Sequence, residues 1–146
     1  MKLKNILVPI DFSESAACAL RYAREMADEC DAVLHVFYVA EFPLRNGADK
    51  PAIERCHGTE LSGLDQLRSF LGPIDETRIK PLCSVGTPLT EIIDYATVHN
   101  IDLIVMATHL RLPSSQMAAP SVTDSIVRQA PCPVLVVPAP VRELVA

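Results

Sequence analysis

The chain has 146 residues, which is the usual size of one domain and enough to bury a hydrophobic core. Apolar residues make up 49% of the sequence and charged residues 21%, a balance that excludes wholesale disorder. The formal net charge is −5 and the basic residues are scattered, which disfavours a nucleic-acid partner because such binding needs a basic face.

The predicted elements alternate along the chain. Short apolar runs rich in β-branched residues are followed by longer segments with helical spacing, which is the βαβ pattern of a parallel sheet. The expected strands cover residues 5–10, 32–39, 78–85, 101–107 and 134–137. The expected helices run from Asp11 and Ser13 to Cys30, within 52–71, from Thr87-Pro88 onward, and over 121–130. No repeat or second domain is visible, so residues 1–146 are expected to form one domain.

The expected helices have recognisable ends and core positions. Gly72-Pro73 should end the second helix, and Thr87 with Pro88 should begin the third. The first helix should bury a stripe of mostly small side chains, namely Ala16, Leu20, Ala23, Ala27 and Cys30. Apolar positions expected in the core of the second and third helices are Ile53, Leu64, Leu67, Leu71, Ile92, Ile93 and Ala96.

Pro81 places the third strand at an edge of the sheet, because proline cannot donate a ladder hydrogen bond. Together with right-handed crossovers this favours the strand order 3-2-1-4-5 in an open α/β sheet with helices on both faces. In that order the chain direction reverses between strands one and four, and ligands of such sheets bind at this switch point. The segments expected to meet there are 9–11 and 106–109.

The start of the chain predicts neither a signal peptide nor a membrane span. Lys2 and Lys4 precede the apolar run 6–8, but Pro9 and Asp11 end that run at once. No later stretch approaches the roughly 20 apolar residues that a membrane span needs. We therefore expect a cytoplasmic protein with no membrane partner.

The cysteines and histidines predict no metal site. Five cysteines with no C-x-x-C pair disfavour a disulfide framework or a zinc site and favour small buried side chains. Cys56 lies in polar surroundings and is the best candidate for a redox-responsive thiol. His35 falls within a buried strand, where it is expected to be a hydrogen-bonded core residue. No nucleophile elbow, Walker A, H-E-x-x-H or G-x-G-x-x-G motif occurs, so catalysis is not indicated.

Four blocks in a fixed order resemble the universal stress proteins of the UspA type. They are the segments 5–13, 85–88, 102–109 and 130–137. The resemblance implies a Rossmann-like domain of the adenine nucleotide alpha hydrolase-like class, with the same 3-2-1-4-5 sheet. It also implies a homodimer that pairs the last strands, Pro133–Val137, of two subunits. An apolar edge strand of this kind is prone to aggregation unless it is covered, which favours the same pairing.

Members of that family that bind ATP carry G-x-x-G, nine residues, then G-[ST]. The matching positions here are Ala107, Leu110 and Pro120-Ser121, so all three glycines are replaced. A phosphate loop directs backbone N–H groups at the anion, often from residues at positive φ. Ala107 and Leu110 oppose that geometry, and Pro120 has no N–H to donate. Losing two charge-assisted contacts costs about 3–6 kcal/mol, which is a factor of about a hundred to ten thousand in affinity.

The base and sugar side of the family's site is better retained. By resemblance, Asp11 matches an adenine-contacting acid, Val39 an adenine-lining aliphatic, and Ser121 the start of the phosphate-proximal helix. The full set of family-equivalent positions is Pro9, Ile10, Asp11, Val39, Met106, Ala107, His109, Leu110, Pro120, Ser121, Val122 and Thr123. Each has a structural alternative: Asp11 and Ser121 as helix or turn caps, His109 as a solvated loop residue, and Val39 as core.

The sequence therefore predicts a dimeric stress-response protein that acts as an interaction or signalling module with weak or no ATP binding, and no enzyme. ATP or AMP, with Mg²⁺, is expected to bind weakly if at all. The alternative is an adenine-nucleotide sensor or slow ATPase with a rearranged phosphate loop. Asp11, Val39 and Ser121 favour that alternative, and Ala107, Leu110 and Pro120 oppose it.

Overall fold

The computed structural model describes residues 2–40, 52–108 and 122–138, and of residues 52–57 it describes the backbone alone. Within these residues, five parallel strands form one sheet in the order β3-β2-β1-β4-β5, as predicted. The strands are β1 (Asn5–Ile10), β2 (Val33–Ala40), β3 (Ile79–Val85), β4 (Leu103–Ala107) and β5 (Val134–Val137). The helices are α1 (Glu14–Cys30), α2 (Ala52–Leu71), α3 (Pro88–Val98) and α4 (Val122–Gln129).

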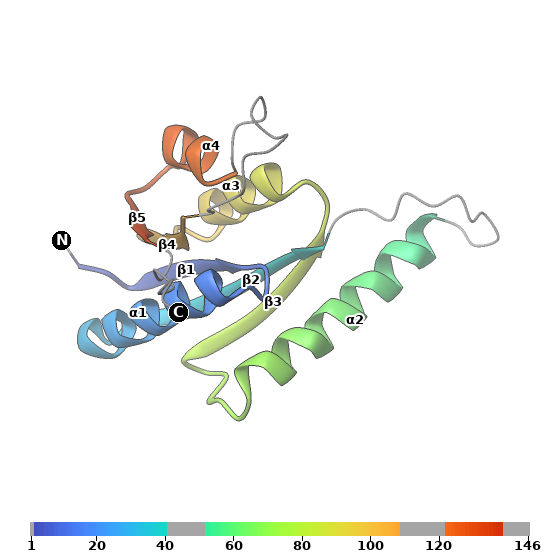
Figure 1. Ribbon diagram of the computed structural model, residues 1–146, viewed down its shortest axis with the longest axis horizontal. Coiled ribbons are helices and arrows are strands. Elements are labelled where there is room, and N and C mark those ends of the chain that lie inside the picture. The colour runs from blue at the N-terminus through green and yellow to red at the C-terminus, as the bar shows by residue number, and fades with distance from the viewer. Residues whose placement is uncertain (1, 41–51, 109–121, 139–146) are drawn as a thin grey trace, which may run out of the picture.

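The helices cover the sheet from both sides, with α1 and α2 on one face and α3 and α4 on the other (Figure 1). This division follows from the strand order, because right-handed crossovers place helices on opposite faces when the chain changes direction along the sheet. Side chains from each strand alternate between the two cores. In β1, Ile6 and Val8 enter the α1–α2 core, whereas Leu7 enters the α3–α4 core.

Helix α1 confirms most of its predicted stripe. Its N-cap is Ser13, whose hydroxyl oxygen accepts a hydrogen bond from the Ala16 backbone N–H at 3.0 Å. The prediction was wrong for Cys30, which is exposed. Cys30 is the last helical residue, and Asp31 follows in the left-handed conformation with a φ of 58°. The buried stripe therefore stops at Ala27, one turn before the end of the helix, and Ala19 supplies a buried contact that the stripe missed.

The other predicted core positions differ in depth. Leu67 and Leu71 of α2 and Ile92 and Ala96 of α3 are buried, whereas Leu64 and Ile93 are only half-buried. The side chain of Ile53 lies outside the described residues. Leu64 of α2 and Ile93 of α3 lie at the border of the buried face of their helix rather than at its centre, which leaves them half-buried.

Two strand boundaries shift from the predicted ones. Strand β2 begins and ends one residue later than 32–39, and β4 begins at Leu103 rather than at residue 101. The Asp102 side chain explains the second shift, because its Oδ2 accepts hydrogen bonds from the backbone N–H groups of Lys4 and Asn5, each at 2.9 Å. Asp102 thus fixes the start of the neighbouring strand β1.

His35 in β2 is buried and hydrogen-bonded, as predicted. The cysteines of the described part are free, with Cys18, Cys83 and Cys132 half-buried rather than fully buried. Burial raises the pKa of the Cys83 and Cys132 thiols, with Glu60 and Asp102 adding to the shift at the two sites respectively. Within the described residues, no helix is both long and apolar enough to cross a membrane.

Candidate functional site

A pocket of about 520 Å³ opens at the carboxyl end of the sheet, where β1 and β4 lie side by side. This is the switch point of the fold, since the chain moves from β1 towards β3 on one side and from β4 to β5 on the other. The volume lies within the range of small-molecule sites. The sequence-based prediction of its place agrees with the geometry.

The structure brings together every predicted site residue that it describes. They line the pocket as a group: Pro9, Ile10, Asp11, Val39, Met106, Ala107, Val122 and Thr123. They come from the carboxyl ends of three strands and the first turn of α4. His109, Leu110, Pro120 and Ser121 lie outside the described residues, so their predicted roles remain predictions.

The described lining also contains residues that were not predicted from the sequence. They are Ser13 and Ala16 of the α1 start, Phe37 and Tyr38 of β2, and Pro88 and Ile92 of α3. Only their places in the fold could have predicted them, because each lies near a strand's carboxyl end or in the first turns of a helix. Phe37 and Tyr38 directly precede Val39, and Pro88 opens the helix that follows β3.

Asp11 lies in a tight turn between β1 and α1. Its Oδ1 accepts a hydrogen bond from the Ser13 backbone N–H at 3.0 Å, and Ser13 in turn caps α1. The structural role foreseen for Asp11, as a turn cap, is therefore present. The side chain is also exposed and lines the pocket. A carboxylate has several acceptor sites and can accept more than one hydrogen bond.

Thr123 anchors the start of α4 at the pocket wall. Its side chain is 7% exposed, and its hydroxyl donates to the carbonyl oxygen of Ala107 at 3.0 Å. This bond ties α4 to the end of β4. Thr123 therefore shapes the pocket chiefly through this contact, with its donor engaged by the protein itself.

The described lining is mostly apolar, and Asp11 supplies its only formal charge at neutral pH. No Lys, Arg or His belongs to the lining that the structure describes. No group of three or more metal-ligating side chains occurs in the described residues either. Such a wall suits a flat heterocycle that packs against aliphatic side chains and donates a hydrogen bond to a carboxylate. The described part of the wall offers no side-chain cation to a polyphosphate.

A model of the universal stress protein family matches residues 2–138. A universal stress protein of Methanocaldococcus jannaschii is 28% identical over 144 residues, covering 96% of this chain and 85% of that protein. The solved structure of a universal stress protein UspA from Lactobacillus plantarum is 29% identical with a TM-score of 0.68, covering 94% of this chain and 99% of that one.

Two more distant structures share the fold and carry nucleotides. One is a universal stress protein in complex with cAMP, 17% identical with a TM-score of 0.64, covering 94% of this chain and 98% of that one. The other is the Archaeoglobus fulgidus universal stress protein in complex with dAMP, 20% identical with a TM-score of 0.57, covering 93% and 98%. With its strand order, its switch-point pocket and these matches, the chain belongs to the universal stress protein family.

Proposed function

We propose that this stress protein works as a homodimeric signalling or interaction module whose pocket accepts an adenine nucleoside or monophosphate and holds ATP weakly or not at all. The observation that carries the proposal is the described part of the pocket wall, which combines an apolar lining with one carboxylate, that of Asp11. We propose no catalytic activity, and a cytoplasmic location stays a prediction.

The base side of the pocket supports an adenine ligand. Val39, Phe37 and Met106 offer apolar surface from two strands on either side of β1. An adenine ring can pack against such a surface, and its exocyclic amine can donate to the Asp11 carboxylate. The complexes of related structures with cAMP and dAMP are in line with a ligand that has one phosphate.

The phosphate side argues against ATP. Ala107 lies at the end of β4, where family members that bind ATP have glycine, and its carbonyl oxygen accepts from Thr123. A triphosphate needs several donors or cations, and the described lining provides no cationic side chain. With Leu110 and Pro120 also in place of glycine, the polyphosphate grip is expected to be lost.

Strand β5 supports a dimer. In the described part of the chain it pairs with β4 alone, so its outer edge is open for a further strand. Leu135 and Val136 are 38% and 37% exposed there. An exposed apolar edge strand favours pairing with a second copy, because the pairing satisfies the open backbone groups and covers the side chains.

Calorimetric titration with adenosine, AMP, ADP and ATP, with and without Mg²⁺, tests the proposed ligand. We expect AMP or adenosine to bind more tightly than ATP, and Asp11→Asn to weaken the binding of both. If none of these ligands gives a binding signal, the proposed nucleotide ligand is refuted and only the proposed role as an interaction module remains. Micromolar binding of ATP would favour the slow ATPase or nucleotide sensor with a rearranged loop instead.

The redox alternative concerns Cys56, whose side chain lies outside the described residues. Titration of the native protein with a thiol reagent separates it from the half-buried thiols of Cys83 and Cys132, whose raised pKa makes them slow to react. A fast-reacting thiol that disappears in Cys56→Ser would support a redox role, and its absence would end that alternative.

A further inference from the structure

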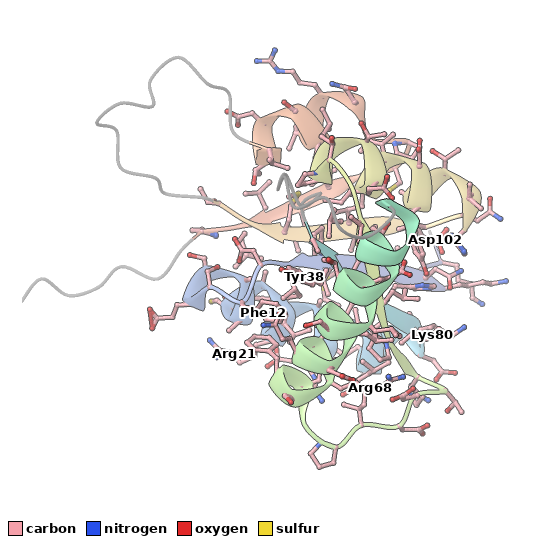
Figure 2. The ribbon with its side chains drawn as sticks, turned by 90° about the vertical axis from the view of Figure 1, so that its right-hand side faces the viewer. Phe12, Arg21, Tyr38, Arg68, Lys80 and Asp102 are labelled. Atoms are coloured by element: carbon pink, nitrogen blue, oxygen red, sulfur yellow. The ribbon has the colours of Figure 1, made fainter. Side chains whose placement is uncertain are left out.

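Tyr38 lies where three elements meet beside the pocket. Its ring centroid is 4.6 Å from that of Phe12, which belongs to the turn between β1 and α1. The Phe12 ring in turn lies 5.4 Å from Phe70 in the last turn of α2, in an edge-on arrangement. Figure 2 shows Phe12 and Tyr38 beside helix α2. The aromatic chain therefore connects α2 to a residue of the pocket lining.

Helix α2 approaches this point so closely that a side chain at position 63 would force its neighbours to shift. A Cβ atom at Gly63 would lie 3.1 Å from two ring carbons of Tyr38 and 2.6 Å from the Sγ atom of Cys83. Tyr38 and Cys83 are partners in the β2–β3 register, so together they form the surface against which Gly63 packs. Glycine destabilises a helix interior, and here it permits the close contact.

Phe12 links the same cluster to the turn that holds Asp11. Its φ is 65°, a left-handed conformation that is unfavourable for a bulky residue. Contacts of its ring with Tyr38 and Phe70 offset this strain. Because Asp11 and Ser13 on either side of Phe12 both line the pocket, the shape of that wall depends on where the Phe12 ring is held.

We propose that the docking of α2 on Tyr38 sets the shape of the pocket, so that α2 controls ligand affinity without touching the ligand. Tyr38 pairs with Ile10 across the β1–β2 register, and both line the pocket. A shift of α2 away from the sheet moves Tyr38 and releases Phe12, and both changes reach the pocket wall. By linkage, a bound ligand stabilises the docked position of α2 to the same extent. The part concerning affinity rests on the proposed function, whereas the part concerning pocket shape does not.

Two glycines of the same helix give a matched test. Gly63→Ala places a methyl group against Tyr38 and Cys83, whereas Gly58→Ala places one in open space. We expect Gly63→Ala to shift the NMR signals of Ile10 and Val39 and to weaken AMP binding by roughly fivefold or more. Gly58→Ala should leave the signals and the affinity unchanged. Adding Cys83→Ala to Gly63→Ala removes the shortest clash and should restore much of the wild-type pattern.

Each outcome decides one part of the proposal. If Gly63→Ala folds and its pocket signals match the wild type, the coupling is refuted. If the wild type binds no AMP, the ligand part of the proposed function fails, and the NMR shifts alone decide whether α2 sets the shape of the pocket. If Gly63→Ala does not fold, Phe70→Leu replaces it, because that side chain is part-exposed at the end of α2. Phe70→Leu should shift the amide signals of Asp11 and Ser13, and unchanged signals would overturn the proposal.

Discussion

The Nδ1 atom of His35 in β2 lies 2.7 Å from the hydroxyl oxygen of Tyr95 in α3, and its Nε2 lies 3.1 Å from Oδ1 of Asn5 in β1. Because an amide oxygen accepts, the proton is assigned to Nε2, and Tyr95 donates to Nδ1. The Tyr95 ring also stacks on His99, with centroids 3.9 Å apart. One buried histidine therefore joins two strands to the helix that covers them, at the end of the sheet opposite the pocket.

This environment predicts a loss of stability in acid. Burial, with smaller contributions from Lys80 and His99, lowers the pKa of His35 from 6.5 to about 4. The folded state thus binds the proton less well than the unfolded state, so the stability present above pH 6.5 falls as the pH drops towards 4. After solvent screening we expect His35 to account for about 2 kcal/mol of this fall. Urea unfolding of His35→Gln should show a shallower pH dependence, and an equal slope in both proteins would refute this assignment.

Removal of the Tyr95 hydroxyl should destabilise the fold at neutral pH. Tyr95→Phe keeps the ring contacts with Phe37 and His99 but leaves Nδ1 of His35 without its donor. An unsatisfied buried acceptor costs about 1–3 kcal/mol. Thermal or urea unfolding at pH 7.5 measures the loss. A variant as stable as the wild type would show that the bond contributes nothing.

The two N-caps of the described helices α1 and α3 offer a matched comparison. Ser13 accepts from the Ala16 N–H at 3.0 Å, whereas Thr87 makes no capping hydrogen bond with its side chain. Ser13→Ala should therefore lower the free energy of unfolding by about 1 kcal/mol, and Thr87→Ala by clearly less. Equal losses in urea unfolding would contradict the difference between the two caps.

Charge on the β5 edge should separate the proposed dimer. Leu135→Asp places a carboxylate on the 38% exposed edge residue, where pairing would bury it. The control is Leu61→Asp, which changes a 52% exposed leucine on α2, the helix that packs against the opposite edge strand β3. Sedimentation at low micromolar concentration should give dimers for the wild type and the control, and monomers for Leu135→Asp. A monomeric wild type would remove the dimer from the account.

Much of the fold could be predicted because local signals and global rules agree. Pro81 placed β3 at the edge, and the structure puts it there. Cys30 was wrongly predicted to be buried because the apolar spacing was extended through the last turn of α1 without regard to where the helix ends. Boundaries such as the start of β4 depend on Asp102 bonding to the residues before β1 and at its start, a contact between residues 97 and 98 positions apart. The spacing of apolar residues within one segment does not predict such a long-range contact.

Site residues whose place follows from the order of strands and helices could be predicted. Contacts between side chains of different elements could not. Asp11, Val39 and Met106 lie at or directly after the carboxyl ends of strands, so the switch-point rule and the family resemblance both predict them. The role inferred for Tyr38 depends on Gly63, Cys83 and Phe12, which come from other elements. Glycine is unfavourable within a helix, so the sequence alone gives no reason for Gly63, whereas its packing against Tyr38 and Cys83 does.

We propose that the replaced glycines abolish tight binding of a polyphosphate while the base side of the pocket remains. The most direct test restores them together, as Ala107→Gly, Leu110→Gly and Pro120→Gly, and compares ATP and adenosine binding by calorimetry with the wild type. We expect ATP affinity to rise by roughly a hundredfold, as regaining two charge-assisted contacts would produce. Adenosine affinity should hardly change. A wild type that already binds ATP at micromolar concentration, or an equal gain for adenosine, would contradict the account.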